Sequence, residues 1–422
     1  MLIGVFIRSG TGSLWLAVCC ASLLTTSGNM LGTHAMAWSE PLFLLCGFSG
    51  LFLLARDTSK NKNLRWVAAA GLLGLAALTR YAGVSLVLAG TASLLFGSGR
   101  FRDRARKAAS LAILAAIPLA GWMIWNVTQG RSSTTRVLGW HPHFSQIFSH
   151  ASGVIGQLLL PARLLSRTTG VLVTLLASGC VVALTIHARR SSDFDATTPR
   201  MTMRAKSCWL LGLVIACYAT FYLAAGTLFD PAIDFRDVRH MLPVLLACFL
   251  LAVLGGYTMW EAAGRRRSVA TMVFVGCCGL LFVLSPRIVN KSLQLSRNSG
   301  SGGEGFHDKK WRASPTIAAV HDLPRNVKLY SNAPDAIYIL THRNSVRMPR
   351  KDAWKQASQN DLKASFERIR RDIENGALIV FLKRLAWRGE SPDAEDLKQC
   401  LPLRAVVDTP DGTIYALADI PD

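Results

Sequence analysis

Charged side chains are scarce in this sequence: only 17% of its 422 residues are Asp, Glu, Lys or Arg, whereas 51% are hydrophobic. A soluble globular protein of this size has no use for so much apolar surface, so part of the chain is expected to face lipid. Among the charged residues the acidic ones are fewer, with 26 Asp and Glu against 47 Lys and Arg. The basic residues stand between apolar runs without aromatic interleaving, which argues against nucleic acid as a partner.

Cysteine chemistry and nucleotide motifs are also missing. Nine of the ten cysteines lie in apolar runs, where a thiol behaves as a small hydrophobic group. Cys400 alone lies in the C-terminal part, which excludes a disulfide inside that part, and no spacing of Cys and His indicates zinc. Neither GxGxxG nor GxxxxGK[ST] follows a predicted strand, so no bound nucleotide is expected.

Composition divides the chain into three parts. Residues 1–286 hold long apolar runs separated by basic clusters, residues 287–305 form a flexible linker rich in Gly and Ser, and residues 306–422 resemble a soluble domain. A transmembrane helix needs about 20 largely apolar residues. The first apolar run, near residues 11–29, could instead be a cleaved signal peptide, with Arg8 as its basic region. The sequence predicts about nine transmembrane segments, near residues 11–29, 36–55, 64–79, 82–97, 108–126, 170–188, 207–226, 241–260 and 268–286.

The run between Arg65 and Arg100 is too long for one straight transmembrane helix and short for two. At 1.5 Å per residue, each half reaches only about 24 Å. Because both flanks are basic, we expect a hairpin that turns at residues 79–81 on the far side of the membrane.

The distribution of Lys and Arg predicts the orientation. With the N-terminus in the cytoplasm, one set of loops carries 18 of these residues and the opposite set carries seven. Cytoplasmic loops are enriched in Lys and Arg. We therefore expect a multi-pass membrane protein with a cytoplasmic N-terminus and an extracytoplasmic C-terminal domain.

The C-terminal part predicts a small α/β domain, so the whole chain is expected to be an α-helical polytopic membrane domain followed by an extracytoplasmic α/β domain. Residues 359–375 form an amphipathic pattern that Gly376 ends, and Pro410-Asp411-Gly412 indicates a hairpin turn. The predicted strands are VKLYSN, SVRMP, ALIVFL, LRAVVDT and TIYALA, and PDAIYILTHR is a predicted short helix.

Ionisable residues inside or at the ends of apolar helices are costly, so each is a functional candidate. Glu40 lies at the outer end of the second predicted span, where its alternative role is to begin the helix together with Ser39 and Pro41. Arg80 lies at the tip of the predicted hairpin. Its guanidinium could hold a phosphate, or it could simply extend to the membrane interface.

The predicted outer loop at residues 230–240 concentrates charge on the membrane surface. Its carboxylates could act as a base or hold a divalent cation, and its arginines could neutralise phosphate. The alternative is an ordinary polar loop between helices. His141 and His143, two apart in another outer loop, are interpreted as surface residues. The ionisable residues of the 230–240 loop are Asp230, Asp234, Arg236, Asp237, Arg239 and His240.

Four runs in this order, AWSEPLFLL, GLLGLAALTRYAGVSLVLAG, GWMIWNVTQG and RHMLPVLLACFLLAV, followed by an α/β domain, resemble the multi-pass C-type glycosyltransferases. More narrowly, the chain is similar to the bacterial branch related to protein mannosyltransferases and aminoarabinose transferases. This resemblance implies a location in the bacterial plasma (inner) membrane, and transfer of a sugar from a polyprenyl-phosphate carrier to a lipid, glycan or protein acceptor on the outer face of that membrane. It also implies that Arg239, in an R-x-x-L-P-like motif, contacts the carrier phosphate, with Arg80 as a second contact.

One departure concerns the family's catalytic acidic residue, which lies in the first outer loop. Residues 1–29 contain no Asp or Glu. The resemblance therefore implies either a chain shortened at its N-terminus, which we favour, or the use of another carboxylate, such as Glu40, Asp237 or Asp234. Arg80, Arg236, Arg239 and His240 are the expected substrate-binding residues.

A polyprenyl-phosphate-dependent glycosyltransferase is the function that the sequence favours. Its donor substrate would be the lipid-linked sugar, and no other cofactor is expected apart from the divalent cation considered above. The rival functions are a transporter or flippase of a lipid-linked or anionic solute, and an inactive, shortened membrane protein that displays its soluble domain. The sequence indicates neither the oligomeric state nor the identity of the sugar.

Overall fold

The computed structural model describes residues 1–25, 27–35, 39–56, 62–97, 99–129, 139–140, 199–228, 238–262, 308–348, 359–388 and 401–418, together with isolated residues elsewhere. The chain forms two compact units, Met1–Leu293 and Gln294–Asp422. The linker expected at residues 287–305 lies outside the described residues, apart from Arg297.

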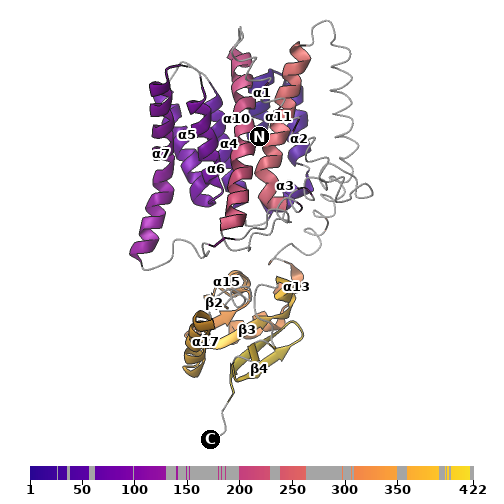
Figure 1. The fold of residues 1–422 in the computed structure, drawn as a ribbon. Coiled ribbons are helices and arrows are strands. Elements are labelled where there is room, and N and C mark those ends of the chain that lie inside the picture. The colour runs from indigo at the N-terminus through magenta and orange to yellow at the C-terminus, as the bar shows by residue number, and fades with distance from the viewer. Residues whose placement is uncertain are drawn as a thin grey trace. The chain divides into compact units, whose positions relative to one another are not determined.

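The first unit is a bundle of helices (Figure 1). By length and apolar composition, three of its described helices can cross a membrane, over Phe101–Thr128, Thr202–Leu228 and Arg239–Thr258. Shorter apolar helices accompany them, so the expected count of about nine spans is not confirmed. The helices are α1 (Leu2–Thr11), α2 (Leu14–Thr25), α3 (Gly28–Ala35), α4 (Glu40–Ala55), α5 (Lys62–Thr79), α6 (Gly83–Leu95), α7 (Phe101–Thr128), α10 (Pro199–Leu228) and α11 (Val238–Ala262).

The single span expected at residues 11–29 is wrong. The chain breaks after α1 because Gly12 adopts a left-handed conformation, with φ at 74°, and its N–H closes the helix on the carbonyl of Arg8. The Ser13 hydroxyl then accepts the Leu16 N–H at 3.2 Å and begins α2. Glycine adopts this conformation without steric cost. An uninterrupted apolar run thus contains parts of three short helices.

The remaining expected spans fall into two groups. Those at 36–55, 64–79, 82–97, 108–126, 207–226 and 241–260 correspond to helices α4, α5, α6, α7, α10 and α11. Those at 170–188 and 268–286 lie outside the described residues, apart from isolated positions.

The predicted hairpin is confirmed, with α5 ending at Thr79 and α6 beginning at Gly83. Gly83 donates its N–H to the Arg80 carbonyl at 2.8 Å, which tightens the turn. A Cβ at Gly83 would lie 2.5 Å from backbone atoms of Ala76 and Ala77. The two helices therefore meet at a point where only glycine fits.

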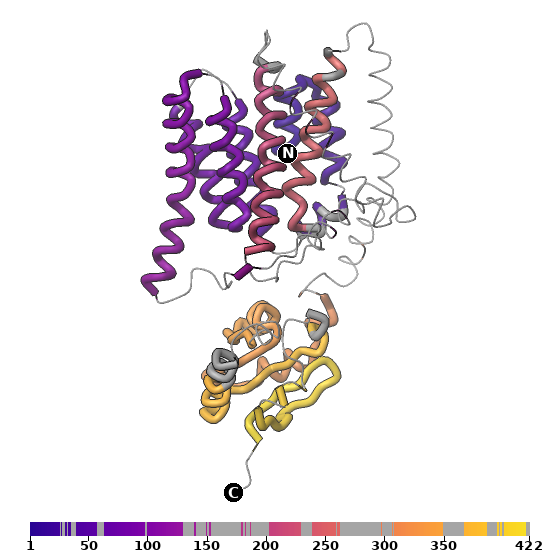
Figure 2. Tube along the Cα trace, in the orientation of Figure 1, coloured from indigo at the N-terminus to yellow at the C-terminus, as the bar shows by residue number. Residues whose placement is uncertain are grey.

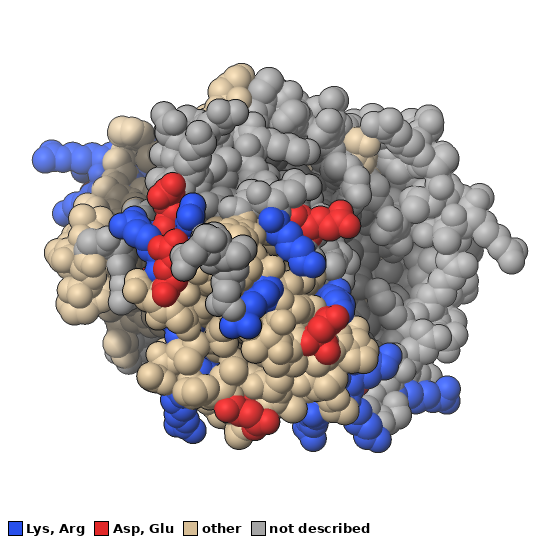
Figure 3. Space-filling view, turned by 90° about the horizontal axis from the view of Figure 1, so that it is seen from below, with Lys and Arg blue, Asp and Glu red and all other residues tan. Residues whose placement is uncertain are grey.

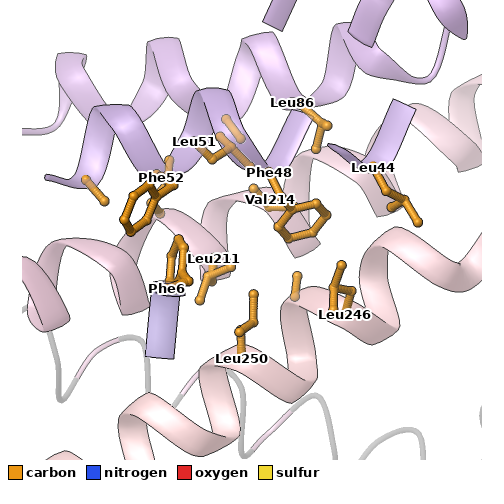
Figure 4. Packing of buried hydrophobic residues seen from close by; sticks show 14 of the residues in the cluster. Phe6, Leu44, Phe48, Leu51, Phe52, Leu86, Leu211, Val214, Leu246 and Leu250 are labelled. Atoms are coloured by element: carbon orange, nitrogen blue, oxygen red, sulfur yellow. The ribbon is translucent and has the colours of Figure 1, made fainter. Parts of the chain in front are cut away.

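The core of the bundle joins segments that are far apart in the sequence. Helix α1 packs against α4, α10 and α11, as the indigo and red tubes show (Figure 2). Phe6 of α1 lies against Phe52 of α4, with ring centroids 5.2 Å apart. Phe48, Val214 and Leu250 belong to the same core (Figure 4). These contacts bring the N-termini of α4 and α11 to one end of the bundle.

The outer surface of α7 is apolar. Ile113, Ile117, Ile124 and Val127 are each more than half exposed. A soluble protein rarely leaves such a stripe open, whereas lipid covers it at no cost. The described helices therefore support a membrane protein.

The second unit is a five-stranded sheet with order β2-β1-β3-β5-β4. Strand β1 is parallel to β2 and β3, and β5 is antiparallel to β3 and β4. Every strand and both helices that the sequence predicts here are confirmed. The elements are α13 (Lys309–Arg312), α14 (Pro315–Asp322), β1 (Leu329–Ser331), α15 (Pro334–Thr341), β2 (Ser345–Arg347), α17 (Gln359–Glu374), β3 (Leu378–Leu382), the 3₁₀ helix η4 (Lys383–Arg388), β4 (Leu403–Thr409) and β5 (Gly412–Leu417).

Strand β3 is covered on both faces because successive side chains point to opposite sides. Val380 and Leu382 pack with residues of α14 and α15. Ile379 and Phe381 pack with residues of α17. The continuous apolar run of β3 therefore has a core on each side, as the central position of this strand requires.

The β4–β5 turn is fastened to the start of α14 by Asp411. Its carboxylate accepts the Ser314 hydroxyl at 2.5 Å and the Thr316 hydroxyl at 2.7 Å. Burial alone would raise the pKa of Asp411, but the hydrogen bonds from Ser314, Thr316 and Thr409 lower it more, so the net pKa is below the ordinary value. An anion at a helix N-terminus is also favourable.

The face in Figure 3 shows the charge distribution of the described surface. Blue Lys and Arg side chains are spread over it, with red Asp and Glu side chains between them. Mixed charge of this kind is typical of a surface that contacts water.

Candidate functional site

Four residues that the sequence singled out separately lie together at one end of the helical bundle. Glu40 is the first residue of α4, Arg80 lies in the α5–α6 turn, and Arg239 and His240 are in the first turn of α11. This is the lower end of the bundle in Figure 1, where α4 and α11 begin and α5 and α10 end. We call Glu40, Arg80, Arg239 and His240 the polar cluster.

Glu40 is the buried centre of the polar cluster, with only 3% of its surface exposed. Its Oε1 forms a close ion pair with Nη1 of Arg80 and lies 3.9 Å from Nε of Arg239. A buried carboxylate is costly unless it is paired, and two guanidinium groups meet that requirement here. Ser39 makes no side-chain hydrogen bond to the start of α4. Because Glu40 pairs with Arg80 and Arg239, its carboxylate has a role beyond the start of the helix.

His240 is the second partner of Arg80. The Nη2 atom of Arg80 lies 3.1 Å from Nδ1 of His240. A guanidinium has only donors, so a hydrogen bond here requires Nδ1 to accept, in the neutral tautomer that carries its proton on Nε2. With a neutral histidine, the polar cluster holds two positive charges and one negative charge.

Two tyrosines of α10 belong to the site, and sequence reasoning missed them. The Tyr218 hydroxyl donates to the His240 carbonyl at 2.8 Å. The Tyr222 ring lies 6.0 Å from the Tyr218 ring and 6.0 Å from the His240 ring, measured between centroids. The available signal was their spacing of four, which places both on one face of a helix.

The two arginines are partly accessible from outside. Side-chain exposure is 21% for Arg80 and 33% for Arg239, against 4% for Glu40. The buried carboxylate thus contacts both guanidinium groups from within the bundle, while part of each arginine side chain reaches the surface. Guanidinium groups favour anions such as phosphate as ligands.

Aromatic side chains mark the same end of the bundle. Tyr81, next to Arg80, packs edge-on against Trp122 of α7 with 6.2 Å between ring centroids. Trp125, on the last turn of α7, is 61% exposed. Tyr and Trp concentrate where the hydrocarbon core meets the head groups. The polar cluster therefore lies at the same end of the bundle as side chains that are typical of the membrane interface.

Basic residues gather at the opposite end of the helices. Arg56 follows the end of α4, Arg65 is in the first turn of α5, and Arg102 is in the first turn of α7. Arg204, in the second turn of α10, pairs closely with Glu261 of α11 and lies 5.0 Å from the Tyr257 ring. These basic residues of the described helices thus lie at the end of the bundle opposite the polar cluster.

The other expected site residues lie outside the described residues. These are Asp230, Asp234, Arg236 and Asp237, and also His141 and His143. Within the described ranges, no group of three or more His, Cys, Asp or Glu side chains could hold a metal ion. The divalent cation considered for the 230–240 loop stays a prediction.

Comparison with models of known families gives no match for this chain, and none of the curated proteins matches it. Two solved structures are similar over 98% of the chain. One is the Archaeoglobus fulgidus oligosaccharyltransferase in complex with Zn and sulfate, at 14% identity and a TM-score of 0.44. The other is ArnT from Cupriavidus metallidurans in the apo state, at 14% identity and a TM-score of 0.40. The chain spans 59% of the first protein's length and 81% of the second's.

Proposed function

We propose that this chain is a membrane glycosyltransferase that moves a sugar from a polyprenyl-phosphate carrier to a lipid, glycan or protein acceptor on the outer face of the plasma membrane. The observation that carries the proposal is the polar cluster. Three separate parts of the chain bring one buried carboxylate and two partly exposed arginines to one end of an apolar bundle.

The proposed substrate fits that arrangement chemically. A polyprenyl-phosphate sugar keeps its tail in the bilayer and its phosphate at the interface. The aromatic residues at the site end support the same interfacial level for Arg80 and Arg239. Guanidinium groups can hold phosphate oxygens through two parallel hydrogen bonds. The polar cluster can therefore bind the one part of the donor that is charged.

The reaction would proceed by attack of an acceptor hydroxyl oxygen on the anomeric carbon of the sugar. The bond from that carbon to the phosphate oxygen breaks, and the carrier leaves as a phosphate monoester. Arg80 and Arg239 stabilise the negative charge that develops on the leaving phosphate. The hydroxyl proton passes to a carboxylate that acts as general base.

Glu40 is better suited to positioning than to accepting that proton. Its carboxylate is buried and lies within ion-pair distance of both arginines. Breaking such a pair leaves an uncompensated buried charge. We assign Glu40 the role of holding Arg80 and Arg239 in place, and Asp234 or Asp237 that of the base.

The functional test is a pair of substitutions at the two arginines. Arg80→Ala and Arg239→Ala should each lower transfer at least about 100-fold, because a preorganised charge contributes about 2.7–4 kcal/mol to a transition state. The measurement is the profile of surface glycans in cells that express each variant at the normal level. Arg106→Ala, an exposed arginine near the other end of α7, is the matched control.

Unchanged glycans in both variants, with normal protein levels, would count against the assignment. A loss of solute uptake with unchanged glycans would favour a transporter instead. The orientation is tested separately by labelling single cysteines placed at Tyr81 and at Arg106. Labelling of the Tyr81 position from the cytoplasmic side would overturn the proposed outer location.

A further inference from the structure

The C-terminal unit contains a cavity that the proposed transfer reaction does not use. It has a volume of about 430 Å³ and lies where the parallel strands β1 and β2 begin, beside Leu329 and Ser345. Cavities of this size are typical of small-molecule sites. No Asp or Glu lines it, whereas Arg325, Lys328, His342 and Arg343 do.

Arg343 supplies a fixed positive charge to the cavity wall. Its side chain is buried, and its guanidinium donates to the carbonyls of Val320, Leu323, Pro324 and Val327 at 2.7–3.3 Å. These carbonyls satisfy its donors, but they are neutral and leave the full charge of the side chain in place. Arg343 therefore fastens the chain after α14 and creates a positive potential that its hydrogen-bond partners do not cancel.

Arg325 adds a second positive charge at the mouth of the cavity, and its side chain is exposed. Burial, and after it the nearby charge of Arg325, lower the pKa of Arg343 below the ordinary value. Neither forms an ion pair with a carboxylate in the part of the chain that the structure describes. Lys328 differs, because its Nζ lies 2.7 Å from Asp372.

Polar groups that can orient a ligand line the same cavity. The Ser345 Oγ is buried and makes no hydrogen bond, which is costly for a hydroxyl. Asn344 offers an exposed amide, and His342 an exposed ring. His342 is fixed at the cavity as the C-cap of α15, where its left-handed backbone, with φ at 54°, lets its N–H donate to the Tyr338 carbonyl.

We propose that this cavity binds an oxyanion, a carboxylate or phosphate group carried by a small polar ligand such as an acidic sugar. Arg325 makes the ionic contact, and Ser345, Asn344 and His342 hydrogen-bond the ligand. Arg343 acts from the wall through its uncompensated charge. The proposal does not depend on glycosyl transfer, because the cavity lies within residues 325–346 of the second unit.

Hydrogen exchange of the purified full chain in detergent tests the proposal, because it locates binding by peptide. The probes are inorganic phosphate and glucuronate, with sodium chloride at equal ionic strength and N-acetylglucosamine as controls. Protection by phosphate, glucuronate or both, in peptides covering 325–329 and 342–347, supports the cavity. Protection by one probe only identifies which oxyanion it prefers. Absence of protection with both probes would overturn the proposal.

Three variants refine the test. Arg325→Ala should weaken anion binding about tenfold, as expected for loss of one charged hydrogen-bond partner. Ser345→Ala should weaken binding less, and Arg312→Ala, an exposed arginine outside the cavity, should leave it unchanged. Protection that persists at full strength in Arg325→Ala would show that the anion binds elsewhere and would overturn the proposal.

Discussion

In each unit, one buried carboxylate joins segments that are distant in the sequence. In the first unit, Glu40 joins the α5–α6 turn to α11 through Arg80 and Arg239. In the second, Asp411 joins the β4–β5 turn to α14. Each carboxylate is buried. Glu40 forms ion pairs and Asp411 accepts hydrogen bonds, in both cases with groups that are distant in the sequence, so removal of either charge should affect more than one element.

Glu40→Gln should separate positioning from chemistry. The amide keeps the shape of the side chain but not the charge that holds the two arginines, so the donor phosphate should bind less tightly. We expect the KM for a polyprenyl-phosphate sugar to rise about tenfold, which corresponds to about 1.4 kcal/mol, with a smaller change in kcat.

Glu40→Asp should restore part of the affinity, because it returns the charge. Glu261→Gln, which breaks the Arg204 pair at the other end of the bundle, is the matched control and should leave the KM unchanged. A kcat loss with unaltered KM in Glu40→Gln would contradict the positioning role.

The stability of the C-terminal unit should depend on acid through Asp411. Its pKa is lowered in the folded chain, so the carboxylate stabilises the fold above its unfolded pKa of about 3.9, and this contribution is lost as pH falls through the lower folded value. Asp411→Asn should cost about 1–3 kcal/mol at pH 7, because buried hydroxyls lose an ionised acceptor.

The same substitution should flatten the dependence of stability on pH below about 4. Urea titrations of the full chain at pH 7 and pH 3, followed by proteolysis of the C-terminal unit, measure both effects. An equal loss of stability on acidification in the wild type and in Asp411→Asn would refute this role.

At the same residue scale, sequence reasoning found polar groups but not their contacts. Glu40, Arg80, Arg239 and His240 were recognisable because ionisable groups are rare beside apolar runs. Their meeting depends on how α4, α5 and α11 pack, which no local pattern contains. Tyr218 and Tyr222 were missed because aromatic residues in an apolar helix equally suit a core or a lipid-facing surface.

The α5–α6 hairpin is the element that most depends on a single small residue. At Gly83 the two helices approach so closely that a methyl group would overlap backbone atoms of α5, which cannot move aside as a side chain would. By contrast, a Cβ at Gly71 of α5 would meet no atom within 4 Å. The two glycines form a natural matched pair.

Gly83→Ala should destabilise the bundle by about 1–3 kcal/mol, the usual cost of overpacking. Gly71→Ala should be neutral or slightly stabilising, because alanine favours a helix more than glycine does. Denaturant titration of each variant in detergent gives the comparison. Equal stability of the two variants would show that the close approach at Gly83 is unimportant.

Elements were predictable where local pattern alone decides them. In the C-terminal unit, the five strands and the helices α15 and α17 followed from the sequence, because apolar runs and turn residues mark them. The short helices α13, α14 and η4 were not predicted. The N-terminal helices did not, because the break at Gly12 lies inside a run that is apolar on both sides. The left-handed backbone of Gly12 ends the helix there, and a hydropathy pattern does not reveal backbone angles.

On the scale of the whole molecule, the two units differ in their surfaces and in the sites that they contain. The first has an apolar exterior, a polar cluster at one end and basic residues at the other, so its orientation in a membrane can be argued from its surface. The second is a sheet with a core on each face and a cavity of its own. Each unit therefore supports a separate binding proposal.

The shortness of α6 has a consequence for the surrounding lipid. Its 13 residues extend about 20 Å, whereas the hydrocarbon layer of a typical bilayer is about 30 Å thick. Hydrophobic mismatch of this size is relieved when the membrane thins locally. The leaflet beside the α5–α6 turn should then dip toward Arg80 and deliver the carrier's phosphate to it. Transfer should consequently be faster in vesicles of short-chain dimyristoleoyl phosphatidylcholine than in those of long-chain dierucoyl phosphatidylcholine, and the reverse order would exclude such thinning as an aid to binding.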